Sequence, residues 1–116
     1  MRLIALAALC AALAAPAALA STSSTPLLGV DGPGFVITLK QSGKSVKTLK
    51  HGTYLFRISD KSGIHNFHLT GPGGFSKKTS VGATGTFNWT ITLKKGTYKY
   101  VCDPHATIMH GSFTVT

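Results

Sequence analysis

Residues 87–93 read FNWTITL, and this stretch decides the fold class. Its apolar side chains stand at every second position, namely at Phe87, Trp89, Ile91 and Leu93, with polar residues between them. A period of two places successive side chains on opposite faces of a strand, so that one face is buried and the other meets water. The stretch therefore predicts a half-buried β-strand that covers one side of a core.

Shorter segments of the same kind lie on both sides of this strand. Residues 35–39, 54–58, 98–102 and 113–115 are rich in β-branched and aromatic residues, and most of them alternate. Glycine-rich and polar turns separate the segments, as at residues 41–44 and 71–74. No window beyond residue 20 has convincing helical periodicity. The sequence therefore predicts an all-β domain, built as a sandwich or a small barrel.

One short motif occurs twice. Residues 49–54 read LKHGTY and residues 93–98 read LKKGTY. Each copy places a glycine turn before a strand that opens with Thr-Tyr. We expect the two copies to enter corresponding strands of the two sheets, with each tyrosine hydroxyl bonded to backbone at the corner. The unit is too short for a solenoid repeat.

The first twenty residues differ from the rest of the chain. A positive start at Arg2 is followed by an apolar run over residues 3–13, a break at Pro16 and the small-residue pattern Ala18-Leu19-Ala20. This is the pattern of a secretory signal peptide, and it is too short for a stable membrane anchor. We therefore expect a signal peptide at residues 1–20, a flexible segment at residues 21–30 and the folded domain at residues 31–116.

The signal peptide predicts that the protein is exported to the periplasm, the cell exterior or the cell surface. Cys10 does not indicate a lipoprotein, because Leu9 precedes it where lipoprotein processing needs a small residue. No other apolar stretch approaches membrane length. After cleavage the chain is expected to have no transmembrane segment and to act as a monomer.

The charge balance is strongly basic, with 12 Lys and Arg residues against 3 Asp and Glu residues. Loss of Arg2 with the signal peptide leaves eleven positive and three negative groups, a net charge of +8. Such a field favours acidic partners and speeds encounter with them. Export and the absence of a recognisable nucleic-acid-binding motif argue against nucleic acid as the partner. Solvated strand faces explain the scattered lysines equally well.

Cleavage also removes Cys10 and leaves Cys102 as the one cysteine. Exported proteins usually pair their cysteines, and an odd thiol outside the cytosol is open to oxidation. Three explanations stay open at this point: a buried inert thiol, an intermolecular disulfide, or a metal ligand.

The segment 102–111, CDPHATIMHG, carries most of the chemical information. It places a thiol at Cys102, an imidazole at His105 and a thioether at Met109 on one predicted loop between strands. Soft sulfur ligands and imidazole suit copper, and two histidines, one cysteine and a weak axial methionine form the site of blue-copper electron carriers. This loop supplies three of those four groups, so a second histidine must come from elsewhere.

Residues 64–69 read IHNFHL and offer two candidates for that histidine. If the segment is a strand, His65 shares a face with Phe67 and Leu69, which should be the core face. His68 would point the other way and is interpreted as a surface or edge residue. A ligand of a buried metal should come from the core face, and we therefore choose His65.

Together these motifs resemble the cupredoxins, close to the plastocyanin and amicyanin branch of blue copper proteins. The matching residues are His65-Asn66, the Cys-x-Pro-His segment at 102–105, and Met109 with Gly111 two positions later. The resemblance implies strong copper ligands at His65, Cys102 and His105, and a weak axial ligand at Met109. It also implies that Asn66 ties the two ligand segments together and helps to hydrogen-bond the cysteine sulfur.

The resemblance further implies an eight-stranded Greek-key sandwich that holds one copper ion near one end and carries single electrons between redox partner proteins. Three residues separate His105 from Met109, a spacing between those usual in plastocyanins and amicyanins, which leaves the reduction potential open. His110 is adjacent to Met109 and is interpreted as a surface residue, as is His51.

Three alternatives stand beside electron transfer: a copper chaperone or storage protein, an enzyme, and a metal-free structural sandwich, which would leave the lone thiol unexplained. A copper chaperone or storage protein would use the same fold and the same ligands. An enzyme is not expected, because the chain has only Asp31, Asp60 and Asp103 for acid–base chemistry and no second metal cluster is apparent.

Overall fold

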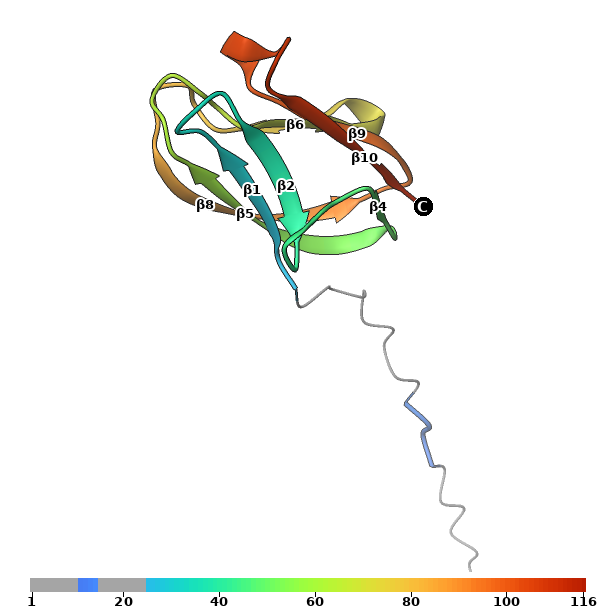
Figure 1. Cartoon of the computed structure of the whole chain (residues 1–116). Coiled ribbons are helices and arrows are strands. Elements are labelled where there is room, and N and C mark those ends of the chain that lie inside the picture. Colours follow the sequence, from blue (N-terminus) through green and yellow to red (C-terminus); the bar gives the residue numbers. More distant parts are fainter. Residues whose placement is uncertain (1–10, 15–24) are drawn as a thin grey trace, which may run out of the picture.

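The computed structural model describes residues 11–14 and 25–116, and residues 25–116 form a β-sandwich (Figure 1). The predicted signal peptide, apart from residues 11–14, and residues 21–24 of the predicted flexible segment lie outside the described residues. Residues 11–14 are exposed and belong to no helix or strand. Within the described part of the chain, no helix is long and apolar enough to cross a membrane.

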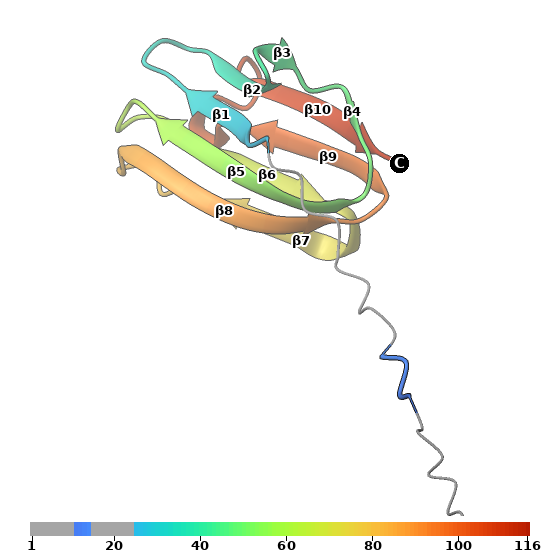
Figure 2. The same ribbon diagram turned by 90° about the horizontal axis from the view of Figure 1, so that it is seen from below.

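Ten strands form two five-stranded sheets, which lie as two layers in Figure 2. The first sheet has the order β3 (Lys44–Ser45), β2 (Ile37–Gln41), β1 (Leu27–Asp31), β5 (Gly52–Asp60) and β8 (Gly85–Leu93). The second has the order β4 (Thr48–Leu49), β10 (His110–Val115), β9 (Gly96–Val101), β6 (His68–Gly71) and β7 (Phe75–Lys78). The all-β sandwich predicted from the sequence is confirmed. The count of ten exceeds the expected eight by β3 and β4, two-residue strands that extend the sheet edges.

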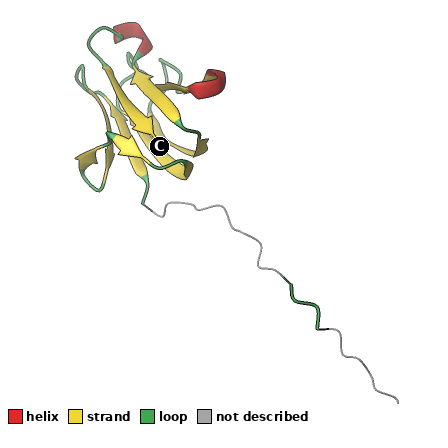
Figure 3. Cartoon of the chain, turned by 90° about the vertical axis from the view of Figure 1, so that its right-hand side faces the viewer, coloured by secondary structure: helices red, strands yellow, loops and turns green. Residues whose placement is uncertain are grey.

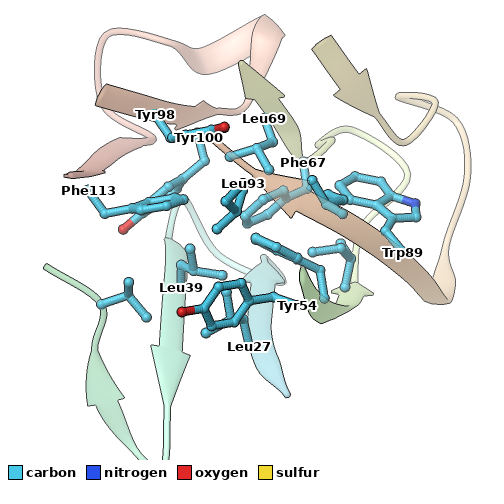
Figure 4. Packing of buried hydrophobic residues seen from close by; sticks show 14 of the residues in the cluster. Leu27, Leu39, Tyr54, Phe67, Leu69, Trp89, Leu93, Tyr98, Tyr100 and Phe113 are labelled. Atoms are coloured by element: carbon cyan, nitrogen blue, oxygen red, sulfur yellow. The ribbon is translucent and has the colours of Figure 1, made fainter. Parts of the chain in front are cut away.

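The long strand that carries the motif FNWTITL forms the edge of the first sheet. It pairs antiparallel with β5 over nine residues, and the side chains of Trp89, Ile91 and Leu93 are buried while the threonines between them are exposed. Aromatic and aliphatic side chains from both sheets meet between the layers (Figure 4). Phe67 stacks on Tyr100 and Tyr98 stacks on Phe113, with ring centroids 5.6 and 5.2 Å apart. Burial of this apolar surface is the main force that holds the two sheets together.

Both copies of the repeated motif form the predicted tyrosine corner. The hydroxyl of Tyr54 donates to the carbonyl of Lys50 at 2.7 Å, and the hydroxyl of Tyr98 accepts from the N–H of Lys94 at 3.0 Å. Tyr54 lies on β5 in one sheet and Tyr98 lies on β9 in the other. The expectation that the two copies enter corresponding strands of the two sheets is therefore confirmed.

Strand boundaries differ from the sequence prediction at the beginning of the domain. β1 starts at Leu27, inside the segment 21–30 that the sequence predicts to be flexible, because Leu27 is fully buried and β1 pairs with both β2 and β5. The folded domain therefore begins four residues before the expected boundary. β2 begins at Ile37 rather than at residue 35, since Phe35 and Val36 belong to a loop closed by the Gly32 N–H and the Val36 carbonyl.

Two other segments also depart from the prediction. The segment 64–69, considered above as a strand, enters a strand only at His68, where β6 (His68–Gly71) begins. The consecutive side chains of His65, Asn66 and Phe67 are all buried, which a strand with one exposed face does not allow. The segment 71–74 contains a single 3-10 turn at Pro72–Gly74 rather than a plain loop, and a second such turn occupies Asp103–His105 (Figure 3).

Three connections gather at one end of the sandwich. They are the β1–β2 loop at residues 32–36, the β5–β6 loop at residues 61–67 and the β9–β10 loop at residues 102–109. β1 begins at the opposite end, at the bottom of the sandwich in Figure 1, while the Asp103–His105 turn lies at the top. This arrangement brings the two sequence segments that carry the candidate ligands to the same end of the fold.

Candidate metal centre

Three candidate ligands from two distant segments meet at this end. Cys102 Sγ lies 3.7 Å from His65 Nδ1 and 3.5 Å from His105 Nδ1, and the two nitrogens are 3.1 Å apart. His65 and Cys102 are fully buried, and His105 is partly exposed. The thiol and the two imidazoles therefore point at one common position.

Backbone hydrogen bonds fix Cys102 and His105 on their loop. The N–H of His105 donates to the carbonyl of Cys102 at 3.0 Å, which closes the 3-10 turn directly after β9. The N–H of Met109 donates to the carbonyl of His105 at 2.8 Å, and the N–H of Cys102 donates to the carbonyl of Met109 at 3.0 Å. Met109 is fully buried. The loop is thus a closed unit with a thiol at one end, a thioether at the other and an imidazole between them.

His65 is held by packing in the β5–β6 loop. Its N–H donates to the carbonyl of Ser62 at 3.2 Å. Gly32 packs so closely on the imidazole that a Cβ there would lie 3.1 Å from His65 Cδ2, and its φ of +74° favours glycine. His65 Nε2 is buried without a hydrogen-bond partner in the described part of the chain. The imidazole therefore presents Nδ1, and not Nε2, to the other two ligands.

Asn66 joins the two ligand loops directly beside the ligands. Its Oδ1 accepts from the N–H of Asp103 at 2.7 Å, and its Nδ2 donates to Asp103 Oδ2 at 2.8 Å and to the carbonyl of Thr79 at 3.2 Å. Among the described residues, the hydrogen bonds of this amide go to Asp103 and Thr79 and not to the cysteine sulfur. The structure thus places Asn66 between the segments, as expected, but shows no bond from its side chain to Cys102.

Asp103 stays ionised at neutral pH. Burial raises the pKa of its carboxyl, but hydrogen bonds from His68 and Asn66, together with electrostatic interactions with His68 and Lys78, outweigh that effect, and the pKa falls below its usual value. His68 Nδ1 lies 2.8 Å from Asp103 Oδ1. His68 itself is on β6, outside the ligand cluster, and its side chain is partly buried.

Two buried carboxyl groups lie side by side where β1 and β5 end. Asp31 and Asp60 are partners in the register of β1 and β5, and both are buried. Asp60 accepts from the Thr79 hydroxyl at 3.0 Å, whereas neither oxygen of Asp31 has a donor among the described residues. Burial, a hydrogen bond to Asp60 and the charge of Asp60 raise the pKa of Asp31 from 3.8 to about 8. Asp31 is therefore protonated at neutral pH.

The surface around the ligands is apolar. The ring of Phe35 meets His65 and His105 edge-on, with centroids 5.3 and 4.9 Å apart, although 56% of the phenylalanine remains exposed. Ile64 and Ile108, which flank the two ligand segments, are exposed at 56% and 63%. The partly exposed imidazole of His105 therefore reaches the surface among large apolar side chains.

The remaining histidines lie away from the cluster. His110 Nδ1 binds the Ala106 carbonyl at 2.9 Å, and His51 Nδ1 binds the carbonyl of Thr116 at 3.0 Å. Sequence reasoning did not assign Asp103, His68 or Phe35 to the site. The position of Asp103 directly after Cys102 was a usable signal, whereas nothing local to His68 or Phe35 reveals contacts made across 30 to 70 residues.

The donor atoms fit a copper ion. Bond lengths of about 2.0–2.1 Å to imidazole and about 2.3 Å to thiolate would place ligand atoms of a trigonal ion about 3.5 Å apart for two nitrogens and about 3.8 Å for nitrogen and sulfur. The nitrogen–sulfur separations of 3.5 and 3.7 Å are close to that arrangement, and the two nitrogens, 3.1 Å apart, lie somewhat closer together than it requires. One thiol with two imidazoles is the donor set of blue-copper sites, and these are the three residues that the described chain brings together as a possible metal site.

A two-sheet sandwich with this donor set at one end defines a cupredoxin, a blue copper protein that takes one copper ion as its cofactor. The model of the family "copper binding proteins, plastocyanin/azurin family" matches residues 38–116. The chain belongs to the plastocyanin/azurin family of copper-binding proteins. Among curated proteins, none matches this sequence significantly.

Solved structures of rusticyanin share the fold. Reduced rusticyanin is 22% identical over 82% of this chain and 83% of its own, with a TM-score of 0.56. Rusticyanin from Thiobacillus ferrooxidans is 24% identical over 82% of this chain and 77% of its own, also with a TM-score of 0.56. A third structure, described as the copper protein rusticyanin, is 26% identical over 82% and 78% with a TM-score of 0.53. The cupredoxin architecture predicted from the sequence is thereby confirmed.

Proposed function

We propose that this protein is an exported electron carrier of the periplasm or cell exterior, with copper bound by His65, Cys102 and His105 and with Met109 as the weak axial ligand. The observation that carries the proposal is the convergence of one thiol and two imidazole nitrogens, 3.1 to 3.7 Å apart, at a single position. Bound there, copper would accept and donate single electrons by cycling between Cu(II) and Cu(I).

The chain supports this role by fixing the loops that carry its donors. Four backbone hydrogen bonds close the Cys102–Met109 loop, and the Asn66 amide fixes that loop against the His65 segment. A site fixed in this way changes little when the oxidation state changes, and a small change favours rapid electron transfer. Burial of Cys102 and Met109 keeps water away from the sulfur atoms, which is one way in which a protein tunes a reduction potential.

His105 is the proposed point at which electrons enter and leave. It is the partly exposed member of the three ligands, the ring of Phe35 packs edge-on against it, and the exposed Ile64 and Ile108 flank the two ligand segments. We expect His105→Gly to slow electron self-exchange of the copper protein by at least about 10-fold, since loss of a ligand also opens the site to water. NMR line broadening in mixtures of oxidised and reduced protein measures this rate. Added imidazole should restore part of it, and an unchanged rate without imidazole would contradict the role.

The burial of two of the three acidic residues supports an acidic redox partner. Asp31 and Asp60 are buried, so only the exposed Asp103 opposes the many lysines on the surface. A partner with an acidic face would be attracted by this charge, while the apolar end around His105 would form the contact. We propose that the protein acts on such partners as a monomer and not as an enzyme, because the four donors together would leave no open position on the ion.

A copper chaperone or storage protein would use the same ligands, and the self-exchange experiment separates it from a carrier of electrons. A carrier keeps its copper through repeated oxidation and reduction. A protein that transports copper would release the ion to a competing chelator within the time of one redox cycle.

A further inference from the structure

We propose that His68 is a positioning residue of the copper site, acting through the Asp103 carboxylate on the spacing between the two ligand loops. This inference rests on the proposed ligands His65 and Cys102. It gives a role to a histidine that sequence reasoning interpreted as a surface or edge residue. His68 does not touch the position of the metal.

His68 connects the frame of the second sheet to the ligand loop. Its Nδ1 lies 2.8 Å from Asp103 Oδ1, and its Nε2 lies 2.8 Å from Ser76 Oγ. A carboxylate can only accept hydrogen bonds, so Nδ1 must carry the hydrogen and donate it to Asp103. Because His68 is on β6 and Ser76 is on β7, which pair antiparallel, the second sheet holds the imidazole through the His68 backbone and through Nε2, which leaves Nδ1 for Asp103.

Asp103 passes this constraint to both ligand segments. Its Oδ2 accepts from Asn66 Nδ2 at 2.8 Å, and its N–H donates to Asn66 Oδ1 at 2.7 Å. Asp103 is covalently adjacent to Cys102, and Asn66 is covalently adjacent to His65. The series Ser76, His68, Asp103 and Asn66 therefore runs from the sheet to the residues next to two ligands.

His68 holds one oxygen of the Asp103 carboxylate, and Asn66 holds the other. Asp103 has 40% of its side chain exposed and no other ion pair within the described residues, so without His68 only the Asn66 amide opposes rotation of the carboxylate into water. Asn66 would then lose its fixed acceptor and retain the Asp103 N–H and the Thr79 carbonyl. Hydrogen bonds to a charged group are among the stronger ones in proteins, and outer groups that orient metal ligands typically affect metal affinity about 10–100-fold.

The test compares His68→Phe, which keeps a flat ring but no hydrogen bond, with His68→Gln, whose amide can still donate to Asp103. His51→Phe is the matched control, because that imidazole also donates to an oxygen, but to the carbonyl of the C-terminal residue Thr116 and not to a group beside a ligand. Two quantities are measured on copper-loaded protein: the rate of copper loss to a chelator and the intensity of the copper–thiolate absorption band. The unfolding free energy of the metal-free protein is measured in parallel.

We expect His68→Phe to raise the rate of copper loss by at least about 10-fold and to change the thiolate band. His68→Gln should keep the rate of copper loss and the intensity of the thiolate band close to those of the unsubstituted protein, and His51→Phe should change neither quantity. Ser76→Ala, a milder change at the far end of the series, should raise the rate in the same direction and keeps the proposal testable if His68→Phe does not fold.

Loss of apo-protein stability without faster copper release or an altered band would overturn the proposal, since a merely structural histidine gives that result. The same conclusion follows if His68→Gln behaves like His68→Phe. Failure of the proposed ligands is recognised separately, because the unsubstituted protein itself would then lack the thiolate band.

Discussion

Replacing Cys102 with serine is expected to weaken copper binding by at least about 100-fold. Loss of an outer group that only orients a metal ligand costs about 10–100-fold in affinity, and the thiolate is a ligand itself under this account. Its sulfur is fully buried and lies 3.5 and 3.7 Å from the two imidazole nitrogens, so no other donor of the described chain is poised to replace it. Competition titration with a chelator of known affinity measures the loss.

Met109→Leu is the matched control for that substitution. Met109 is as deeply buried as Cys102 and lies at the other end of the same loop. Since an axial thioether is a weak ligand, leucine should leave most of the affinity intact and change mainly the reduction potential. If Cys102→Ser bound copper as tightly as the unsubstituted protein, the thiol would not be a ligand.

The metal-free protein is expected to lose stability as the pH rises from about 4 to about 8. Asp31 has its pKa raised from 3.8 to about 8 by burial and by its hydrogen bond with Asp60 and the charge of Asp60. The folded state therefore keeps a proton that the unfolded chain releases, and the stabilising contribution is complete below 3.8 and is lost progressively up to about pH 8. At about 1.4 kcal/mol per pKa unit the total reaches several kcal/mol, which is a large part of a typical domain's stability of about 5–15 kcal/mol.

Asp31→Asn isolates this effect, because an amide can donate to the Asp60 carboxylate but does not titrate. The variant should show a flatter dependence of unfolding free energy on pH and should exceed the unsubstituted protein in stability at pH 9, as measured by chemical denaturation. Asp103→Asn is the control. The lowered pKa of Asp103 places its own effect in acid, so the slope between pH 6 and 9 should not change. If the unfolding free energy of the unsubstituted protein and of Asp31→Asn changed equally with pH, Asp31 would not keep a proton in the folded state.

The fold could be predicted from the sequence wherever one face of a strand is buried. The alternation at residues 87–93 and 54–58 placed Trp89, Ile91, Phe56 and Ile58 correctly on the core side. The repeated Gly-Thr-Tyr motif gave both tyrosine corners for the same reason, because the hydrogen bond spans only four residues. Local patterns are sufficient where local contacts set the structure.

Prediction failed where tertiary contacts replace local pattern. Phe35 and Val36 have the composition of a strand, but the loop after β1 carries them to the surface beside the ligands. The segment at residues 65–67 is buried on every side by the two sheets and the ligand loop, so the rule of alternation does not apply to it. His65 was chosen as a ligand on the assumption of a strand that the structure does not contain, yet it lies in the cluster.

The candidate site shows the same division. The order of Cys102, His105 and Met109 within eight residues is a property of the sequence and was sufficient to suggest copper. Other contacts at the site connect residues that are 29 to 70 positions apart in the sequence. They are those of His68 with Asp103, of Phe35 with both imidazoles and of Asp31 with Asp60. Such pairs are created by the folding of the two sheets and by nothing that either partner displays on its own.

The most direct test is a visible absorption spectrum recorded while the purified protein, without its first twenty residues, is titrated with Cu(II). If the lone thiol and the two imidazoles grip the ion together, an intense band in the red part of the spectrum grows linearly and stops at one equivalent. A pale solution with only weak absorption at full copper loading would show that sulfur is not bound to the metal, and the assignment of this sandwich as an electron carrier would have to be abandoned.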